Sequence, residues 1–250
     1  MNILITGATS GFGKQIAIDC IKNGFIVIGT GRRQNKLDEL KNELGDDFIP
    51  LCFDISNISA TKTALQTLPN DILANIDVLI NNAGLALGLE SADKTNISDW
   101  QTMINTNTLG LVNITHEILP FMVAKNDGYI INISSTAGNY PYFGANVYGA
   151  TKAFVTQFSL NLRADLIGKK VRVTNIEPGL CGGTEFSNVR FHGDDDKASK
   201  VYENVEFIRP EDISNMVLWL INQPKHINVN RLEIMPTAQT FAGLTVVKDL

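Results

Sequence analysis

Short apolar runs alternate with longer segments of helical periodicity along this chain. Most of the short runs are apolar at successive positions, which is typical of strands in a parallel sheet that helices cover on both faces. Strands are therefore expected at residues 2–6, 25–30, 48–53, 77–82, 129–134, 171–176 and 231–235. The alternation predicts an α/β fold with a doubly wound, mostly parallel, seven-stranded sheet and helices on both faces.

Helical periodicity fills most of the chain between those runs. Helices are expected at residues 12–23, 34–44, 59–68, 98–125, 147–167 and 210–222. Ser98 and Gln101 resemble a capping box at the start of the longest one. No linker or internal repeat interrupts the pattern, so residues 1–250 are expected to form a single domain. The one long irregular stretch, 177–209, follows a strand at the edge where such sheets bind ligands, and we expect it to be a substrate lid.

Charge, hydropathy and cysteine content argue against several classes of protein. A net charge of −5 does not favour a nucleic-acid partner, and no apolar run approaches the ~20 residues that span a bilayer. No basic region precedes the first apolar stretch, so no signal peptide is expected. Three scattered cysteines suit a reducing cytoplasm and form neither a disulfide framework nor a metal motif. We expect a cytoplasmic protein without membrane, nucleic-acid or metal partners.

The first predicted strand runs directly into the glycine-rich stretch "TGATSGFGK". Glycines at such a turn let the backbone approach a pyrophosphate, whose charge then faces the N-terminus of the following helix. The spacing is one residue longer than the usual dinucleotide fingerprint, and a simple tight turn is the alternative interpretation. With a strand before it and a helix after it, the loop favours a dinucleotide cofactor on a Rossmann fold. The predicted contacts are Gly7, Thr9, Ser10, Gly11, Phe12 and Gly13.

The end of the second strand indicates which dinucleotide is bound. A site for NAD usually carries a carboxylate here, but none occurs from Phe25 through Leu37. Arg32 and Arg33 stand there instead, and two guanidiniums suit the 2′-phosphate of NADP. A solvated basic turn is the alternative. At the end of the third strand, Asp54 is expected to accept a hydrogen bond from the adenine amino group, and the neighbouring Ile55 is included in the predicted site.

Strands four and five also end in residues suited to a ligand. In "NNAG", Asn81 would brace the backbone beside the cofactor while Ala83 and Gly84 permit its close approach, although a plain turn is the alternative. Ser135 ends the next strand, thirteen residues before Tyr148. Its position at a strand end, and that of the tyrosine at the start of the next helix, predict that both face one ligand cleft.

Tyr148 and Lys152 are spaced four residues apart on a predicted helix. That spacing places them on one face, where the lysine charge would favour the ionised tyrosine and lower its pKa from about 10. Taken alone, the stretch is more typical of an ordinary amphipathic helix.

These motifs together resemble the short-chain dehydrogenase/reductase family along nearly the whole chain. T-G-x-x-x-G-x-G, N-N-A-G, Asn107 in "NTNTLG", Ser135, Y-x-x-x-K and "EPG" occur in the family's order and spacing. Within the family, "GRRQNKL", "YGATKAFV", "EPGLCGGTEFSNVRF" and the closing "FAGL" are similar to bacterial NADP-dependent 3-hydroxy acid dehydrogenases, also described as serine or L-allo-threonine dehydrogenases. The resemblance implies a homotetramer that reversibly oxidises a β-hydroxyl or reduces the matching semialdehyde.

The resemblance also assigns roles to individual residues. Tyr148 would be the general acid/base, and Lys152 would lower its pKa, together with the charge of the oxidised nicotinamide, and hold the nicotinamide ribose. Ser135 would orient the substrate oxygen, and Asn107 would anchor a water chain that leads protons away. The loop after strand six would contact the cofactor through Pro178, Gly179, Leu180, Gly182 and Thr184.

Three positions depart from the commoner family pattern. Ser10 stands where many NADP-preferring members carry a basic residue, which leaves phosphate recognition mostly to the two arginines. Thr184 lies one residue later than usual, and Phe12 replaces a more frequent aliphatic residue.

A 3-hydroxy acid substrate requires a cation for its carboxylate. Arg190 is the candidate for binding this carboxylate. The alternative is that Arg190 only balances the negative charge of the aspartates 194–196. The stretch 139–144, "NYPYFG", is expected to wall the pocket with aromatic rings, or simply to pack.

Two other functions remain open from the sequence. The same catalytic residues with a different pocket would make a reductase of ketones, sugars or other carbonyls. The same fold would also suit a non-catalytic NADP-binding regulator. The intact Ser135, Tyr148 and Lys152 argue against the regulator, since a sensor has no need of them.

Overall fold

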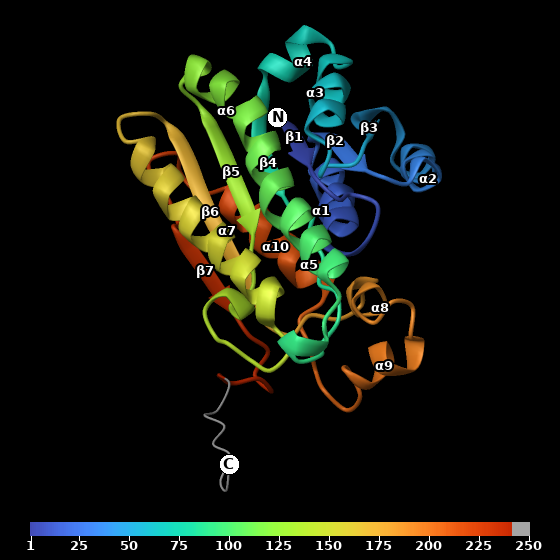
Figure 1. Cartoon of the computed structure of the whole chain (residues 1–250). Coiled ribbons are helices and arrows are strands. Elements are labelled where there is room, and N and C mark those ends of the chain that lie inside the picture. Colours follow the sequence, from blue (N-terminus) through green and yellow to red (C-terminus); the bar gives the residue numbers. More distant parts are fainter. Residues whose placement is uncertain (242–250) are drawn as a thin grey trace, which may run out of the picture.

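The computed structural model describes residues 1–241, in which one sheet of seven parallel strands forms the centre of the molecule (Figure 1). The strand order is β3-β2-β1-β4-β5-β6-β7, and every neighbouring pair is parallel. The strands are β1 (Asn2–Ile5), β2 (Ile26–Gly31), β3 (Phe48–Cys52), β4 (Ile76–Asn81), β5 (Gly128–Ile133), β6 (Val171–Pro178) and β7 (Arg231–Ile234). The predicted doubly wound α/β fold is confirmed, and each strand ends within a residue or two of its expected bounds.

Helices cover both faces of this sheet, with α6 and α7 on one side and α1 and α10 on the other (Figure 1). The helices are α1 (Gly11–Lys22), α2 (Gln34–Leu44), α3 (Ile58–Gln66), α4 (Asn70–Ala74), α5 (Ile97–Ile104), α6 (Leu111–Lys125), α7 (Asn146–Asp165), α8 (Phe186–Arg190), α9 (Asp195–Lys200) and α10 (Pro210–Ile221).

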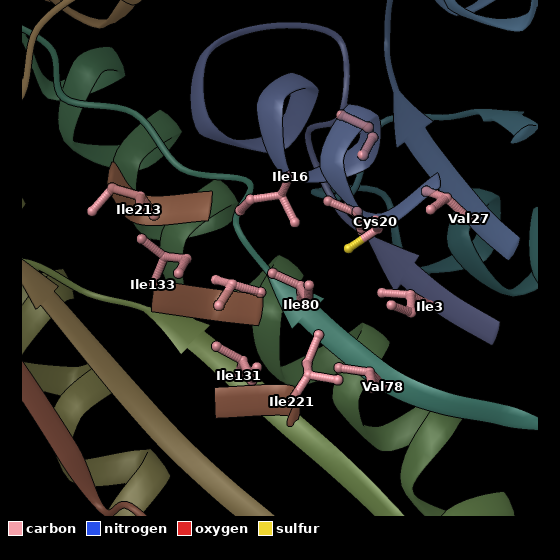
Figure 2. Close-up of a cluster of buried hydrophobic side chains, with 14 of the residues drawn as sticks. Ile3, Ile16, Cys20, Val27, Val78, Ile80, Ile131, Ile133, Ile213 and Ile221 are labelled. Atoms are coloured by element: carbon pink, nitrogen blue, oxygen red, sulfur yellow. The ribbon is translucent and has the colours of Figure 1, made fainter. Parts of the chain in front are cut away.

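Two hydrophobic cores lie between the helices and the sheet. Side chains alternate along each strand, so Ile3 and Ile5 of β1 enter one core and Leu4 enters the other. Figure 2 shows the first core, where Ile80 of β4 and Ile131 of β5 lie among side chains from α1 and α10. Strands that are apolar on both faces therefore have a buried partner layer on each side, which explains the continuous apolar runs of the sequence.

The longest predicted helix, 98–125, is divided in the structure. α5 ends at Ile104, a π-helical segment follows over Asn105–Gly110, and α6 then begins. The predicted capping box at Ser98 and Gln101 is wrong, because the cap is Asn96, whose Oδ1 accepts a hydrogen bond from the Ser98 amide at 3.0 Å. An asparagine side chain at this position satisfies one of the amides that the first helical turn leaves without a partner.

The 177–209 segment is more regular than expected. β6 continues to Pro178, and two short helices, α8 and α9, follow. The segment closes on itself, since the Ile208 amide donates to the Leu180 carbonyl and the Gly182 amide donates to the Ile208 carbonyl, at 3.1 and 3.0 Å. This pairing fixes both ends of the segment beside the carboxyl edge of the sheet.

The described residues also bear on the compositional expectations. Cys20, Cys52 and Cys181 are free thiols. Across residues 1–241, no helix combines the length and apolar character needed to cross a bilayer, and no three metal-binding side chains gather in one place. Of the closing "FAGL" motif only Phe241 is described, and its other residues lie outside the described part of the chain.

Candidate active site

A cavity of about 670 Å³ opens at the carboxyl edge of the sheet. It is lined by the segments that follow β1, β2, β3, β4, β5 and β6, together with α8 and the loop after β7. In doubly wound sheets, ligands bind at this edge, where connections diverge to the two faces. The residues predicted from the sequence come mostly from these same segments.

The glycine-rich loop between β1 and α1 forms one wall of the cavity. Gly7 and Gly11 have φ angles of +69° and +53°, a region that side chains disfavour. Gly13 does not line the cavity. It lies under the loop, where a Cβ would be 2.2 Å from the Gly7 carbonyl oxygen and would push the loop away from the helix. The absence of this side chain lets α1 pack directly under the turn.

The N-terminus of α1 is available to an anion. Ser10 occupies the cap position, but its side chain accepts no capping hydrogen bond, and the first turn of α1 contains no acidic residue. The first amides of a helix have no partner within the helix and carry partial positive charge. A turn with glycines at positions 7 and 11, in front of a helix without a capping side chain, fits the pyrophosphate of a dinucleotide.

Two arginines line the cavity at the end of β2. Arg33 donates to the Thr9 hydroxyl at 3.2 Å and forms an ion pair with Glu185 at 2.9 Å. Arg32 lies 3.5 Å from the carboxylate of Asp54 at the end of β3. The guanidiniums are half-exposed, so they can reach a phosphate at the cavity mouth.

The carboxylate of Asp54 is held in its ionised form. Partial burial opposes ionisation, but hydrogen bonds from the amide and hydroxyl of Ser56, and the charge of Arg32, together lower the pKa of Asp54. Ile55 lines the same part of the cavity. An ionised carboxylate is a hydrogen-bond acceptor, the role expected for Asp54 toward an adenine amino group.

The "NNAG" turn after β4 contributes its second asparagine rather than its first. Asn81 is buried, and its Nδ2 donates to Thr115 and Asn132 at 2.9 and 2.8 Å, away from the cavity. Asn82 lines the cavity and donates to the carbonyls of the glycine-rich loop, at 2.9 Å for Thr6 and 3.2 Å for Gly7. Successive side chains at a strand end point to opposite faces, and this alternation separates the two asparagines.

Ser135, Tyr148 and Lys152 line one region of the cavity. Ser135 follows β5, and its Oγ donates to the Pro178 carbonyl at 3.3 Å. Tyr148 and Lys152 lie one turn apart near the start of α7, and the lysine Nζ is 5.9 Å from the centre of the tyrosine ring. That Nζ donates to the Ile133 carbonyl at 2.9 Å, which ties α7 to the end of β5.

Burial disfavours the charged forms of both side chains on α7. It raises the pKa of Tyr148, assisted by the nearby Tyr142, whereas Ser135 and Arg190 act in the opposite direction. It also lowers the pKa of Lys152, from 10.5 to about 8. The sequence predicted that Lys152 would lower the pKa of Tyr148, but in the protein alone burial is the largest effect on this pKa and raises it, and the opposing effects come from Ser135 and Arg190.

Asn107 lies in the π-helical segment behind the cavity wall. Its Oδ1 accepts from the Leu85 amide at 2.9 Å, and its Nδ2 donates to the Leu85 carbonyl and to Thr151 at 2.8 and 3.0 Å. A Cβ on Gly84 would lie 3.3 Å from both the Asn107 Oδ1 and the Lys152 Nζ, so these two side chains converge on the same glycine. π-helical turns inside longer helices are frequent at functional sites.

The loop after β6 forms another wall of the cavity and contacts the glycine-rich loop, since a Cβ on Gly11 would lie 3.1 Å from the Thr184 side chain. Pro178, Gly179, Leu180 and Thr184 line the cavity. Gly182 does not, because it packs against Phe207, whose ring lies 2.6 Å from the position of a Cβ on that glycine. The Leu180 amide donates to the Gln239 side chain at 2.6 Å, a contact 59 residues away in sequence that no local motif could have indicated.

Arg190 lies at the end of α8 with its guanidinium in the cavity. It donates to the Gly88 carbonyl at 3.2 Å and to the Tyr142 hydroxyl at 3.0 Å. The guanidinium carbon is 5.6 and 5.7 Å from the ring centres of Tyr142 and Tyr148. In the described residues it forms no ion pair with the aspartates 194–196, so the alternative of simple charge balance has no support in its contacts.

Several aromatic side chains line the cavity that contains Tyr148. The "NYPYFG" stretch, which was expected to wall the pocket, supplies only some of them. Tyr140 and Tyr142 line the cavity, whereas Phe143 is 76% exposed. Phe186 of α8 lies 5.9 Å from the Tyr148 ring, and Tyr202 also lines the cavity. Sequence reasoning missed these last two residues, although both fall within the segment already singled out as a lid.

A glycine-rich loop, a basic strand end, and a serine, tyrosine and lysine at one sheet edge define a dinucleotide-binding α/β protein. The model of the short chain dehydrogenase family matches residues 1–194. The chain belongs to this family, and the resemblance predicted from its motifs is confirmed.

Full-length relatives and a solved structure are similar to this chain. A probable NADP-dependent dehydrogenase of Haemophilus influenzae is 63% identical over 98% of this chain and 97% of its own length. An NADP-dependent 3-hydroxy acid dehydrogenase of Escherichia coli K12 is 58% identical over 98% of this chain and 99% of its own length. The closed form of a serine dehydrogenase complexed with NADP+ superimposes with a TM-score of 0.98 at 57% identity, and the match covers 100% of both chains.

Proposed function

We propose that this chain is an NADP-dependent dehydrogenase that oxidises the hydroxyl group of short 3-hydroxy acids or reduces the corresponding semialdehydes. The candidate substrates are serine, L-allo-threonine, 3-hydroxypropionate and 3-hydroxyisobutyrate. One observation carries the proposal beyond the family: the Arg190 guanidinium lies in the same cavity as the Tyr148 hydroxyl, beside its ring. A cation whose guanidinium carbon lies 5.7 Å from the centre of the Tyr148 ring suits a substrate with a carboxylate a few bonds away from its hydroxyl.

The basic end of β2 supports NADP as the coenzyme. Arg32 and Arg33 line the cavity mouth, and Arg33 is linked to the glycine-rich loop through Thr9. Guanidiniums bind phosphate oxygens through paired, charge-assisted hydrogen bonds. The relatives named as NADP-dependent enzymes support the same coenzyme.

In the proposed mechanism, Tyr148 removes the proton of the substrate hydroxyl while Ser135 donates a hydrogen bond to the same oxygen. Bound NADP+ would supply the acceptor for the hydride of the substrate carbon, together with a positive charge that favours the ionised tyrosine. A carbonyl forms, and the proton remains on the tyrosine oxygen until it leaves. Because burial raises the pKa of Tyr148, the phenol needs this added charge to act as a base near neutral pH.

Lys152 and Asn107 support that proton transfer. Lys152 is held by the Ile133 carbonyl, and the pKa lowered to about 8 lets it exchange a proton near working pH. The side chains of Asn107 and Lys152 both lie next to Gly84. This proximity supports the predicted role of Asn107 beside the proton path. Its side chain is hydrogen-bonded to the Leu85 backbone and to Thr151, so it also fixes the backbone at Leu85.

A substrate screen tests this function. Purified protein is mixed with NADP+ and each of the four 3-hydroxy acids, with propanol and isopropanol as neutral controls, and NADPH formation is followed by absorbance. We expect turnover of the acids to exceed that of the alcohols by at least about tenfold, as a lost charge-assisted contact implies. Arg190→Met should remove that preference while sparing the alcohols.

The alternatives give different results in the same screen. A carbonyl or sugar reductase would consume NADPH with neutral ketones or sugars and would ignore the carboxylate. A regulator would bind NADPH without turning over any substrate.

We also propose a homotetramer in the cytoplasm. Phe154 and Phe158 of α7 stack at 5.9 Å, and Phe154 is 42% exposed. Ile104 and Leu109, at and beyond the end of α5, are also exposed, and α5 packs beside α7. Apolar side chains gathered on adjacent helices are typical of subunit interfaces. The free thiols support a reducing compartment.

A further inference from the structure

The side chain of Arg33 is already occupied by the protein's own oxygens. One terminal nitrogen of its guanidinium lies 2.9 Å from the Glu185 carboxylate, and the other donates to Thr9 at 3.2 Å. Both Arg33 and Glu185 line the cavity. An incoming phosphate group must therefore share this guanidinium with a carboxylate or displace it.

Glu185 comes from the segment that also carries the candidate substrate contact. It is the cap residue of α8, directly after Thr184, whose side chain packs against Gly11 of the glycine-rich loop. The same short helix ends at Arg190, which is bonded to Gly88 and Tyr142. One helix thus places an anion at the basic strand end and a cation beside Tyr148.

Electrostatics gives the direction of the effect. A 2′-phosphate and the Glu185 carboxylate are both anions, so each weakens the attraction of Arg33 for the other. Arg32 is 3.5 Å from Asp54 and is shared with an anion as well. The side chains of Arg33 and Glu185 are 42% and 50% exposed, so water and salt screen the interaction strongly.

We propose that Glu185 weakens the preference for NADP(H) by competing with the 2′-phosphate for Arg33. The inference rests on the proposed binding of NADP. The carboxylate lowers the affinity for NADP(H), has no comparable effect on a coenzyme that lacks the phosphate, and speeds the exchange of NADP(H). It therefore moderates the affinity that the two arginines would otherwise give.

Binding measurements without substrate test the competition. NADPH and NADH are titrated by fluorescence into the wild type, Glu185→Gln, and Glu43→Gln as a matched control. Glu43 is a carboxylate of a neighbouring groove that pairs with Lys14 at 3.3 Å, so its replacement removes the same charge without changing the contacts of Arg33. Glu185→Gln should tighten NADPH binding by about two- to tenfold at low salt and leave NADH binding unchanged. Glu43→Gln should leave both affinities unchanged.

Salt and a second substitution sharpen the result. The gain in Glu185→Gln should shrink as salt is raised, and it should vanish in an Arg33→Ala background. Equal tightening of NADPH and NADH, no tightening, or weaker NADPH binding would each overturn the competition. A wild type with no preference for NADPH over NADH would contradict the proposed function itself, whereas a clear preference that Glu185→Gln does not alter would overturn only this inference.

Discussion

Tyr148 and Lys152 are buried one helical turn apart, and only 7% and 6% of their surfaces are exposed. Burial favours the neutral form of each, raising the pKa of the tyrosine and lowering that of the lysine. A group arranged for proton transfer in this way is destabilising when it is charged in the folded protein. The proposed reaction needs the ionised tyrosine, whereas the stability of the fold favours the neutral form of both side chains.

Tyr148→Phe tests the proposed proton transfer. The substitution removes one oxygen with little change in shape, so the fold and NADPH binding should survive. Loss of general acid/base catalysis typically lowers the rate by about 10²–10⁴-fold, and loss of substrate positioning should place this variant at the upper end. Turnover and NADPH affinity are measured separately, and near-wild-type turnover would eliminate the tyrosine as the acid/base.

Lys152→Met should slow the reaction and stabilise the fold. Because the pKa of Lys152 falls from 10.5 to about 8 on folding, the unfolded chain binds more protons between those values, and wild-type stability rises with pH there. Below pH 8 the buried charge destabilises the wild type, so the variant should be more stable by about 1–3 kcal/mol at pH 7.

The pH dependence of this difference is the decisive measurement. Urea unfolding at pH 7, 8, 9 and 10 should show the advantage of Lys152→Met shrinking as pH rises. Lys169→Met, at an exposed lysine, should show no such trend. A constant difference across this range would show that Lys152 does not titrate as inferred.

At the scale of single elements, the turn between β1 and α1 depends on Gly13. A Cβ at this position would lie 2.2 Å from the Gly7 carbonyl oxygen, so Gly13→Ala must displace the loop. We expect a loss of about 1–3 kcal/mol in stability, as for other overpacked sites, and much weaker NADPH binding.

A second glycine supplies the control for that prediction. Gly24 has a φ of +78° and no atom within 4 Å of a Cβ, and it lies at the other end of α1. Gly24→Ala should lower stability by about 1 kcal/mol through backbone strain and should spare NADPH binding. If both variants bind NADPH like the wild type, the loop does not hold the coenzyme.

The elements themselves were predictable because the apolar periodicity of this chain follows its burial. Strands that are covered on both faces appear in the sequence as continuous apolar runs, and the strands and their bounds were predicted from these runs. The π-helical segment at Asn105–Gly110 could not be predicted, since its residues continue the same helical pattern as α5 and α6.

The predictable part of the site is the part fixed by local spacing. The glycine-rich loop, Ser135 and the Tyr148–Lys152 pair meet in one cavity because each is set by its position at a strand or helix end. Choosing Asn81 rather than Asn82 depended on the exact residue at which β4 ends, and sequence periodicity does not fix an end that closely. Gln239 reaches the site from far along the chain.

At the scale of the whole molecule, the exposed faces of α5 and α7 should govern assembly. Phe154→Asp puts a charge into the stacked pair with Phe158, and we expect it to convert a tetramer into smaller species. Light scattering after gel filtration measures the mass. Ile58→Asp, at an exposed isoleucine of α3, should leave the mass unchanged. A monomeric wild type would contradict the proposed tetramer.

The strand order β3-β2-β1-β4-β5-β6-β7 also has a consequence for how the protein is made. β1 leaves the ribosome first, β2 and β3 add to one side of it, and β4 through β7 then add in turn to the other. Each new strand meets an existing edge, and none must be inserted between two strands already paired. The sheet can therefore grow outward while the chain is still being synthesised, and β7 is the last strand to be added, at one edge of the sheet.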